Sequence, residues 1–367
     1  AVFSTQSWGA IIAPFIIGMI ADKFFAAQKI LGVLHLAGAG LLYYITTQTT
    51  FGSFYSLLLI YMIIYMPTLA LVNAIALKQV TSAEKQFSGL RMWGTIGWIV
   101  AGAIIQWMAW ENNPESLSIT YKVAAATSAL FGVYSFFLPN TPPPKAGQKV
   151  SISEVLGLDA LKILKDKNYL IFFIASILIC IPLAFYYGQA NLFLNESGMV
   201  GAAGKMTLGQ VAETVFLFLM PFFFKRFGVK QMLLIGMFAW VLRYLLFSYG
   251  DMNSGLWMLY FGIILHGICY DFFFVTGQIY TDHKAGERVR SSAQGLITLA
   301  TYGVGMYIGF WAAGKIVGSY AITDAAGKVI NHNWQTIWIY PCLFAAGVSL
   351  LFMIFFKNDK KTVEAQN

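Results

Sequence analysis

Residues 169–193 read YLIFFIASILICIPLAFYYGQANLF and contain no charged side chain. A helix needs about 20 mainly apolar residues to cross the hydrocarbon core of a bilayer, so this stretch predicts a transmembrane helix. Similar stretches follow one another along the chain, and they predict eleven helices at roughly 2–21, 28–47, 53–77, 88–110, 120–138, 169–193, 206–224, 229–249, 255–280, 291–318 and 335–356. The sequence therefore predicts an all-α polytopic membrane protein.

The composition of the whole chain supports this prediction. Of the 367 residues, 58% are hydrophobic and only 11% are charged, whereas about 25% of the residues of an ordinary soluble domain are charged. The three cysteines, Cys180, Cys269 and Cys342, lie singly in apolar stretches, with neither a CxxC pair nor metal-ligand spacing. The composition excludes a disordered chain and a disulfide scaffold, and we expect neither a bound metal nor a cofactor.

The positions of the basic residues predict the orientation. Most of the 24 Lys and Arg lie on every second connection or in the C-terminal tail, near 22–29, 78–91, 139–168, 225–230, 282–290 and after 356. An excess of Lys and Arg marks the cytoplasmic loops of membrane proteins. We therefore expect a multi-pass protein of the inner membrane with a cytoplasmic C-terminus. The net charge of +8 is then a topological signal, and we expect no nucleic-acid site.

The longest connection, 139–168, divides the predicted helices into five and six. Transporters are often built from two equivalent halves, so we interpret the chain as a six-plus-six protein that lacks its first helix. The expected parts are an N-terminal bundle (1–138, helices 2–6), a cytoplasmic linker (139–168) and a C-terminal bundle (169–367, helices 7–12) with a short tail. The linker contains an amphipathic stretch from Ile152 to Leu164, which predicts a helix on the inner membrane surface.

A short basic turn follows the first predicted helix and is half-repeated about 200 residues later. The first copy contains Gly18, Asp22 and Lys23, and the second runs from Lys225 to Lys230 without the aspartate. The first copy is similar to the G-x-x-x-D-R/K turn that major facilitator transporters carry between their second and third helices. We therefore expect Gly18, Asp22 and Lys23 to form a gating turn.

Two carboxyl groups lie in the middle of predicted spans. An ionisable group at this depth costs roughly 2.5–3.5 kcal/mol on insertion scales, so such groups are usually functional. Glu213 shares a helical face with Gln210, three residues before it. One interpretation is a structural hydrogen-bonded pair, and the other is substrate contact combined with protonation.

The second carboxyl group, Asp271, is surrounded by aromatic residues. A carboxyl group in an apolar environment is suited to gaining and losing a proton, which predicts proton coupling. The alternative is an ion pair with Arg243 or Lys315, and both interpretations hold if that pair is switchable.

Polar and aromatic side chains recur at helical spacing elsewhere. Arg91, Thr95 and Trp98 share one face and offer a guanidinium, a hydroxyl and an indole, which suits a ligand with hydroxyl groups and a flat ring. The alternative is that Arg91 reaches the cytoplasmic surface and Trp98 packs in the core. His266 and Tyr270 form another i, i+4 pair, with His266 either functional or structural.

Several segments resemble the nucleoside:proton symporters of the major facilitator superfamily, in particular bacterial nucleoside permeases. The resemblance is collinear over nearly the whole chain and is carried by Tyr65–Asn73, Arg91–Trp98, Leu156–Asp159, Gln210–Thr214, Pro221–Gly228, Trp240–Arg243, Tyr249–Asp251, Tyr270–Phe273 and Ser292–Gly295. It implies the major facilitator fold of two six-helix bundles, with a central cavity that binds a nucleoside and couples its entry to protons.

The resemblance implies functional roles for the matching positions, which are Arg91, Thr95, Gln210, Glu213 and Asp271. Together with the spacing of the other polar and aromatic residues, the residues expected to bind substrate are Arg91, Thr95, Trp98, Tyr187, Gln210, Glu213, His266 and Tyr270, with Trp98, Tyr187 or Tyr270 stacking on the base. Asp271, together with Glu213, is expected to carry the proton. The family has Tyr and Phe where this chain has His266 and Tyr270, so the substrate contacts differ there.

We expect a monomeric importer of nucleosides that works by alternating access in the lipid bilayer. The alternatives are a permease for a sugar or a small anion, and a polytopic membrane enzyme. Against an enzyme, the sequence contains neither an HExxH nor a GxSxG motif.

Overall fold

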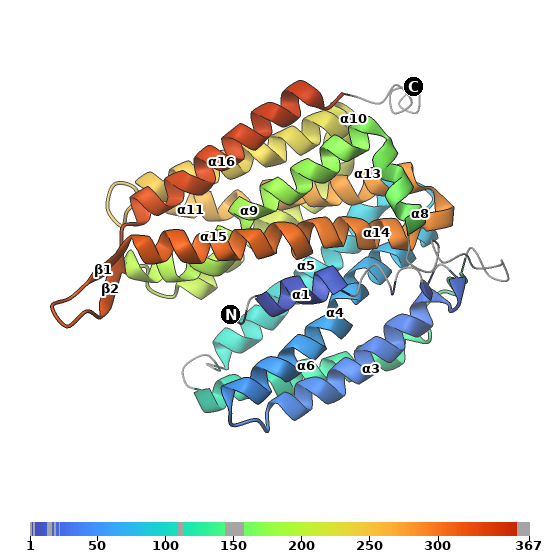
Figure 1. Cartoon of the computed structure of the whole chain (residues 1–367), viewed down its shortest axis with the longest axis horizontal. Coiled ribbons are helices and arrows are strands. Elements are labelled where there is room, and N and C mark those ends of the chain that lie inside the picture. Colours follow the sequence, from blue (N-terminus) through green and yellow to red (C-terminus); the bar gives the residue numbers. More distant parts are fainter. Residues whose placement is uncertain are drawn as a thin grey trace. The chain divides into compact units, whose positions relative to one another are not determined.

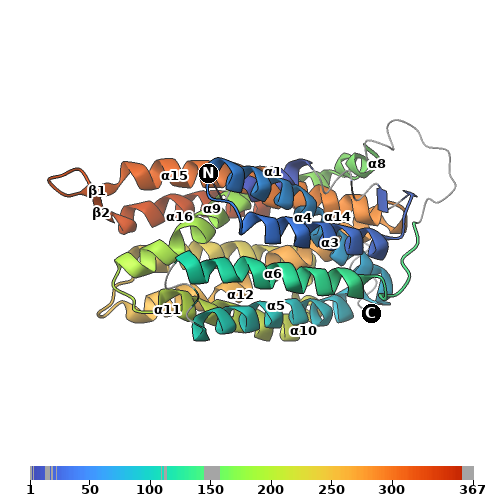
Figure 2. The same cartoon turned by 90° about the horizontal axis from the view of Figure 1, so that it is seen from below.

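The computed structural model describes residues 2, 4–12, 17, 20–21, 23–108, 110, 114–143 and 158–357. Most of these residues are helical, as predicted (Figures 1 and 2). The α-helices are α1 (Ser4–Ile12), α3 (Ala27–Ile45), α4 (Phe51–Gln79), α5 (Ala83–Trp107), α6 (Pro114–Ser135), α8 (Leu158–Leu161), α9 (Lys167–Glu196), α10 (Ala202–Tyr249), α11 (Leu256–Ile264), α12 (His266–Tyr270), α13 (Thr276–Ala285), α14 (Arg290–Thr298), α15 (Met306–Ser319) and α16 (Trp334–Phe355).

Short elements complete the described part of the chain. They are the 3₁₀ turns η1 (Lys162–Lys165) and η3 (Glu287–Val289), the π-helical segments η2 (Asp271–Val275) and η4 (Leu299–Gly305), and the antiparallel strands β1 (Ala321–Thr323) and β2 (Val329–His332). Both π-helical segments interrupt a longer helical run. Such segments occur frequently at functional sites, and η2 begins with the carboxyl-bearing residue Asp271.

Seven helices or helical runs in the described residues are long and apolar enough to cross a membrane. They are Phe51–Gln79, Ala83–Ile105, Lys167–Glu196, Ala202–Tyr249, Leu256–Ala285, Arg290–Ser319 and Trp334–Phe355. The multi-pass character of the chain is therefore confirmed, whereas the number of eleven helices stays a prediction.

The 48 residues of α10 contain two of the predicted spans, 206–224 and 229–249. Gly228, which lies between them, has φ 68° and ψ 179°, outside the helical region. A positive φ is favourable for glycine alone because it has no Cβ. The structure therefore places a sharp break inside the short basic turn that the sequence predicts from Lys225 to Lys230.

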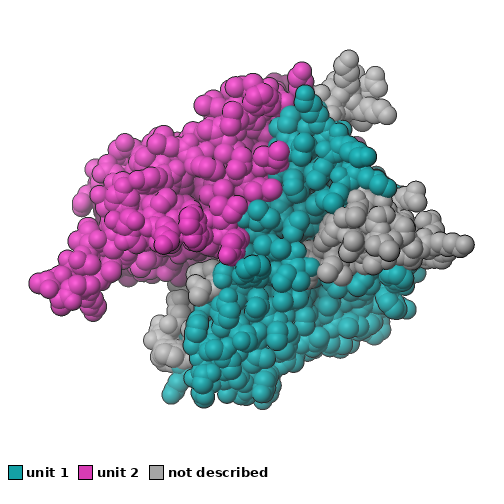
Figure 3. Space-filling view, in the orientation of Figure 1, with its two compact units in different colours: residues 1–83, 104–173, 278–304 teal, residues 84–103, 174–277, 305–367 magenta. Residues whose placement is uncertain are grey.

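The chain folds into two compact units, coloured separately in Figure 3. Unit 1 contains Ala1–Ala83, Ile104–Phe173 and Gln278–Val304, and unit 2 contains Glu84–Ala103, Ile174–Gly277 and Gly305–Asn367. The division at 139–168 into two bundles stays a prediction. Of the predicted amphipathic helix, α8 and η1 lie in the described part, while residues 144–157 lie outside it.

In unit 1, α3 packs against both α4 and α6 (Figures 1 and 2). A small apolar core joins α3 and α4, with Leu31 and Leu71 almost completely buried. The side chain of Gln28 then ties the start of α3 to the chain after α6. Its Nε2 donates to Asn140 at 2.9 Å, and its Oε1 accepts from the Thr141 N–H at 3.0 Å.

In unit 2, α10 packs along α16 and also contacts α11, α12 and η2 (Figure 1). The Tyr244 hydroxyl of α10 donates to the Pro182 carbonyl of α9 at 2.6 Å. The β1–β2 hairpin lies at one end of α15 and α16 (Figures 1 and 2). It is tied to the end of α9 because the Glu196 carboxylate contacts His332 at 2.9 Å and accepts from Trp334 at 2.8 Å.

Candidate functional site

All residues that the sequence predicts for substrate binding and proton coupling lie in unit 2. They come from α5 (Arg91, Thr95, Trp98), α9 (Tyr187), α10 (Gln210, Glu213), α12 (His266, Tyr270) and η2 (Asp271). Five helical elements thus bring their polar groups into one compact part of the chain. The individual contacts show which of these residues interact.

Thr95 and Glu213 form a buried hydrogen bond between α5 and α10. The Thr95 hydroxyl donates to Oε1 of Glu213 at 2.7 Å. Thr95 is 6% exposed and Glu213 is 8% exposed. A hydrogen bond to a carboxylate is short and strong, particularly away from water. Glu213 is thus held by Thr95, and no hydrogen bond links it to Gln210 in the described structure.

Arg91 and Tyr270 form the second link between predicted site residues. Nη2 of Arg91 donates to the Tyr270 hydroxyl at 2.9 Å, and its guanidinium carbon lies 5.6 Å from the centre of the ring. This contact directs Arg91 toward α12, while the alternative that Arg91 reaches the cytoplasmic surface stays untested.

His266 lies at the centre of an aromatic and charged cluster. Its Nε2 is 3.8 Å from Oε2 of Glu213, and its Nδ1 is 3.2 Å from Nη1 of Arg243. Its ring stacks on Tyr186 at 5.4 Å and meets Tyr187 edge to face at 6.4 Å. The sequence analysis did not identify Arg243 as a partner of His266. The signal that could have done so is the position of Arg243 itself, a cation within the predicted span 229–249.

Two glycines allow α12 to come this close to α10. A Cβ at Gly267 would lie 2.6 Å from the backbone of Ala212 and Glu213, and a Cβ at Gly209 would lie 3.0 Å from Cβ of His266. Real Cβ atoms do not approach backbone at 2.6 Å, so the contact at Gly267 requires glycine. The sequence therefore sets the distance between Glu213 and His266 through small residues as well as through the polar groups themselves.

Asp271 is completely buried, and neither oxygen of its carboxyl group has a hydrogen-bond partner among the described residues. No ion pair joins it to Arg243 or to Lys315 in the described part of the chain, so this alternative is not found. An unpaired carboxylate is very costly in an apolar environment, whereas its protonated form is not. The surroundings of Asp271 therefore favour a carboxyl group that holds a proton.

Three other predicted residues differ in how they are placed. Trp98 is 69% exposed and Tyr187 is 40% exposed, so neither is packed in a core. Gln210 is half-buried on the same helix as Glu213. Trp98 is therefore not packed in a core in this structure, and its role in stacking stays a prediction.

The predicted gating turn lies mostly outside the described residues. Gly18 and Asp22 are among the residues that are not described, and Lys23 is buried at 5% exposure. The function of this turn stays a prediction.

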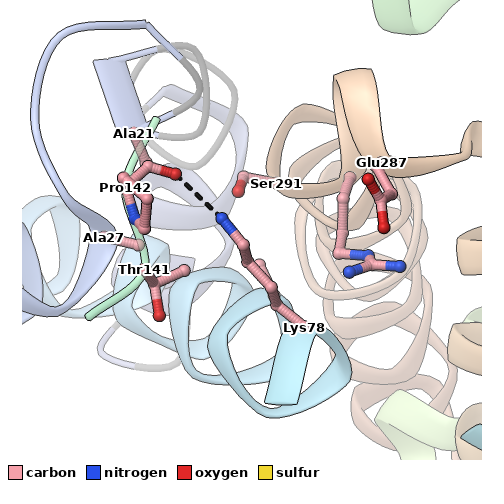
Figure 4. Close-up of a pocket in the computed structure, with 9 residues that line it drawn as sticks. Ala21, Ala27, Lys78, Thr141, Pro142, Glu287 and Ser291 are labelled. Atoms are coloured by element: carbon pink, nitrogen blue, oxygen red, sulfur yellow. Dashed lines mark hydrogen bonds between the residues drawn. The ribbon is translucent and has the colours of Figure 1, made fainter. Parts of the chain in front are cut away.

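A small pocket lies in unit 1, and Figure 4 shows its lining. Lys78 extends into it and donates from Nζ to the Pro142 carbonyl at 3.0 Å. Arg290 also lines the pocket and pairs with Asp282. The residues around this pocket include none of those predicted to bind substrate.

Comparison with known proteins gives a consistent result. A family described as "Nucleoside H+ symporter" matches residues 1–361. YegT of Escherichia coli, a nucleoside-transporter candidate, is 44% identical over 99% of this chain and 86% of its own length. The crystal structure of a mutant of the nucleoside transporter NupG superposes with a TM-score of 0.77 at 30% identity, covering 97% of this chain and 90% of that one.

A more distant match identifies the fold. The major facilitator superfamily transporter FucP, in its outward conformation, superposes with a TM-score of 0.71 at 15% identity. That match covers 98% of this chain and 89% of FucP. With the helical architecture and the buried polar groups of unit 2, these findings show that the chain has the major facilitator fold and belongs to the nucleoside H+ symporter family of membrane transporters.

Proposed function

We propose that this protein imports nucleosides together with protons by alternating access, and that it does so in the inner membrane with its C-terminus in the cytoplasm. The observation that carries the proposal is the polar array of unit 2, in which Arg91, Thr95, Glu213 and Asp271 lie on otherwise apolar helices. Membership of the nucleoside H+ symporter family supports it. So do the names of YegT and NupG, which describe nucleoside transport.

The polar groups match the chemistry of a nucleoside. A carboxylate such as Glu213 accepts hydrogen bonds from ribose hydroxyls, and a guanidinium such as Arg91 donates to ribose or base oxygens. The aromatic rings of Trp98, Tyr187 and Tyr270 provide flat surfaces for a base. Tyr187 and Trp98 are exposed in this structure, which leaves their faces available to a ligand.

Proton coupling is assigned to Asp271. Its carboxyl group is buried without a hydrogen-bond partner among the described residues, and it interacts electrostatically with Glu213 and Arg91. Loss of its proton therefore changes the electrostatic environment of the ligand-binding groups. Protonation and substrate binding are thereby linked within one part of the chain, as a symporter requires.

The remaining expectations belong to the same proposal. We expect the protein to act as a monomer in the lipid bilayer. We also expect a bundle of helices on each side of the connection 139–168, so that substrate reaches the site alternately from the two faces of the membrane.

The test is uptake of radiolabelled uridine and adenosine into proteoliposomes that contain the purified chain. We expect accumulation when the outside is more acidic than the inside, and loss of accumulation when a protonophore is added. Liposomes without protein are the control. Accumulation that follows a sodium gradient would refute proton coupling, and competition by sugars or small anions instead of nucleosides would refute the substrate.

A further inference from the structure

Arg243 is a buried cation whose charge has no adjacent carboxylate. The residue is 0% exposed, and no carboxylate of the described residues lies within 4.0 Å of it. Its guanidinium carbon is 3.3 Å from the centre of the Tyr186 ring and 5.7 Å from that of Phe247. Among the described residues, its Nε and Nη2 have no hydrogen-bond partner, while Nη1 contacts His266. A buried charge is normally paired, so this arrangement requires an explanation.

The contact with Arg243 determines the tautomer of His266. A guanidinium has donors only, so Nη1 can form its 3.2 Å hydrogen bond with Nδ1 only if Nδ1 is the acceptor. A ring nitrogen that accepts a hydrogen bond carries no proton. The imidazole of His266 is therefore neutral, and its single proton is on Nε2.

The protonated nitrogen of His266 faces Glu213. Nε2 lies 3.8 Å from Oε2 of Glu213, beyond hydrogen-bond length, so in this arrangement the N–H dipole attracts the carboxylate without a full bond. The other oxygen of Glu213 accepts from Thr95 at 2.7 Å. The imidazole thus lies between the Arg243 cation and the Glu213 carboxylate. It presents its unprotonated Nδ1 to the cation and its Nε2–H to the carboxylate.

We infer that Arg243 is a positioning residue that acts through His266. It fixes the Nε2–H tautomer, and that N–H attracts Oε2 of Glu213 across 3.8 Å, which favours one orientation of the carboxylate toward the ligand. His266 therefore stays neutral during transport and does not carry the proton. This inference rests on the proposed function for the role of Glu213, while the tautomer follows from the geometry alone.

The titratable and charged groups that surround the imidazole and Glu213 come from every element packed against them. They are Arg91 on α5, Tyr186 and Tyr187 on α9, Arg243 on α10, Cys269 and Tyr270 on α12, and Asp271 on η2. Arg243 is the cation in contact with the ring itself. Its positive charge opposes a second positive charge on the imidazole, which agrees with the neutral tautomer.

The tautomer can be measured without any substrate. The full chain, labelled with ¹⁵N- and ¹³C-histidine and reconstituted in lipid, is studied by solid-state NMR from about pH 5 to pH 8, the range in which histidines ordinarily titrate. The signals that disappear in His266→Gln belong to His266; if that variant fails to fold, a chain in which the other three histidines are replaced gives the same assignment. We expect an unprotonated Nδ1 and a protonated Nε2 throughout. A proton on Nδ1, or on both nitrogens at the acidic end, would overturn the inference.

The functional part is tested by equilibrium binding of uridine. His266→Leu removes both nitrogens and should raise the dissociation constant by up to about tenfold, because the attraction between the Nε2–H and the Glu213 carboxylate is lost. His266→Gln can accept from Arg243 and donate to Glu213, so it should stay within about threefold of wild type with an unchanged pH profile. If glutamine is as damaging as leucine, or if the pH profile shifts, His266 acts in another way.

A double-mutant cycle separates positioning through His266 from an independent effect of Arg243. Arg243→Met, which has no hydrogen-bond donor, should raise the dissociation constant about tenfold in the wild-type background and less than about twofold in the His266→Leu background. Equal effects in both backgrounds would contradict the inference. If no variant and no wild type binds a nucleoside, the proposed substrate fails, while the NMR result still decides the tautomer.

Discussion

The hydrogen bond between Thr95 and Glu213 gives the sharpest test of the candidate site. Thr95→Val removes the hydroxyl that donates to Oε1 at 2.7 Å and keeps the shape of the side chain. A hydrogen bond to a charged group contributes about 1.5–3 kcal/mol, and the acceptor left behind is in a residue only 8% exposed. We therefore expect the free energy of unfolding to fall by about 1.5–3 kcal/mol.

The same substitution should also weaken nucleoside binding. Without the Thr95 hydroxyl, only the weaker attraction of the His266 N–H orients the Glu213 carboxylate. Part of the binding energy of the ligand is then spent on fixing that orientation. A penalty of about 1.4 kcal/mol corresponds to a tenfold higher dissociation constant, which is the change we expect. Thr95→Ser keeps the donor and is the matched control, expected within about twofold of wild type.

Both quantities are measured on the purified full chain in detergent. Uridine binding is followed at equilibrium with a radiolabelled ligand, and unfolding is followed in denaturant by tryptophan fluorescence. If Thr95→Val binds and unfolds like wild type, the reasoning about the buried contact is wrong. If stability falls but binding is unchanged, the contact serves the fold alone and Glu213 does not orient the ligand.

Three further perturbations test other parts of the structure. Asp271→Asn cannot release a proton, so we expect proton-driven accumulation of uridine in proteoliposomes to be lost while uridine exchange across the membrane continues. Retained accumulation would exclude Asp271 as the proton carrier. Gly267→Ala places a Cβ 2.6 Å from the α10 backbone, which should lower the free energy of unfolding by about 1–3 kcal/mol. The control Gly314→Ala has open space around the new Cβ and should not lower the free energy of unfolding. Equal effects of the two substitutions would contradict the close approach of α12 to α10. Burial alone would raise the pKa of Asp166, but its hydrogen bond and ion pair with Lys284 lower the pKa below the usual value. The resulting stabilisation is present above the unfolded pKa of about 4 and is lost as the pH falls through the folded value. Asp166→Asn should therefore remove at most about 1 kcal/mol at neutral pH and flatten the acid side of the stability profile, measured as the denaturant midpoint against pH.

The helices of this protein could be predicted because a bilayer imposes a simple requirement on the sequence. Long apolar runs such as 169–193 must form helices that satisfy their own backbone, and α9 follows that run closely. The break at Gly228 was also predictable, since a short basic turn separates two apolar runs there. The π-helical segment at Asp271–Val275 was not, because a shift to i→i+5 hydrogen bonding leaves the hydrophobic pattern almost unchanged.

The candidate site was predictable as a set of residues and only partly as a set of contacts. Ionisable groups such as Glu213 and Asp271 are conspicuous in apolar spans, so the sequence alone identifies them. Their partners depend on how helices pack, which spacing along one helix does not determine. One interpretation pairs Arg243 with Asp271, whereas Arg243 contacts His266 in the structure.

The different surroundings of the two carboxyl groups imply a division of labour. Glu213 receives a hydrogen bond from Thr95 and faces the N–H of His266, so its surroundings complement a negative charge. Asp271 has no donor among the described residues, so its surroundings favour the protonated form. When the surroundings of two titratable groups favour different protonation states, the group that exchanges a proton and the group that stays charged can be assigned. We therefore expect Glu213 to hold the ligand and Asp271 to exchange the proton, with Arg91 and the charge of Glu213 coupling the two events.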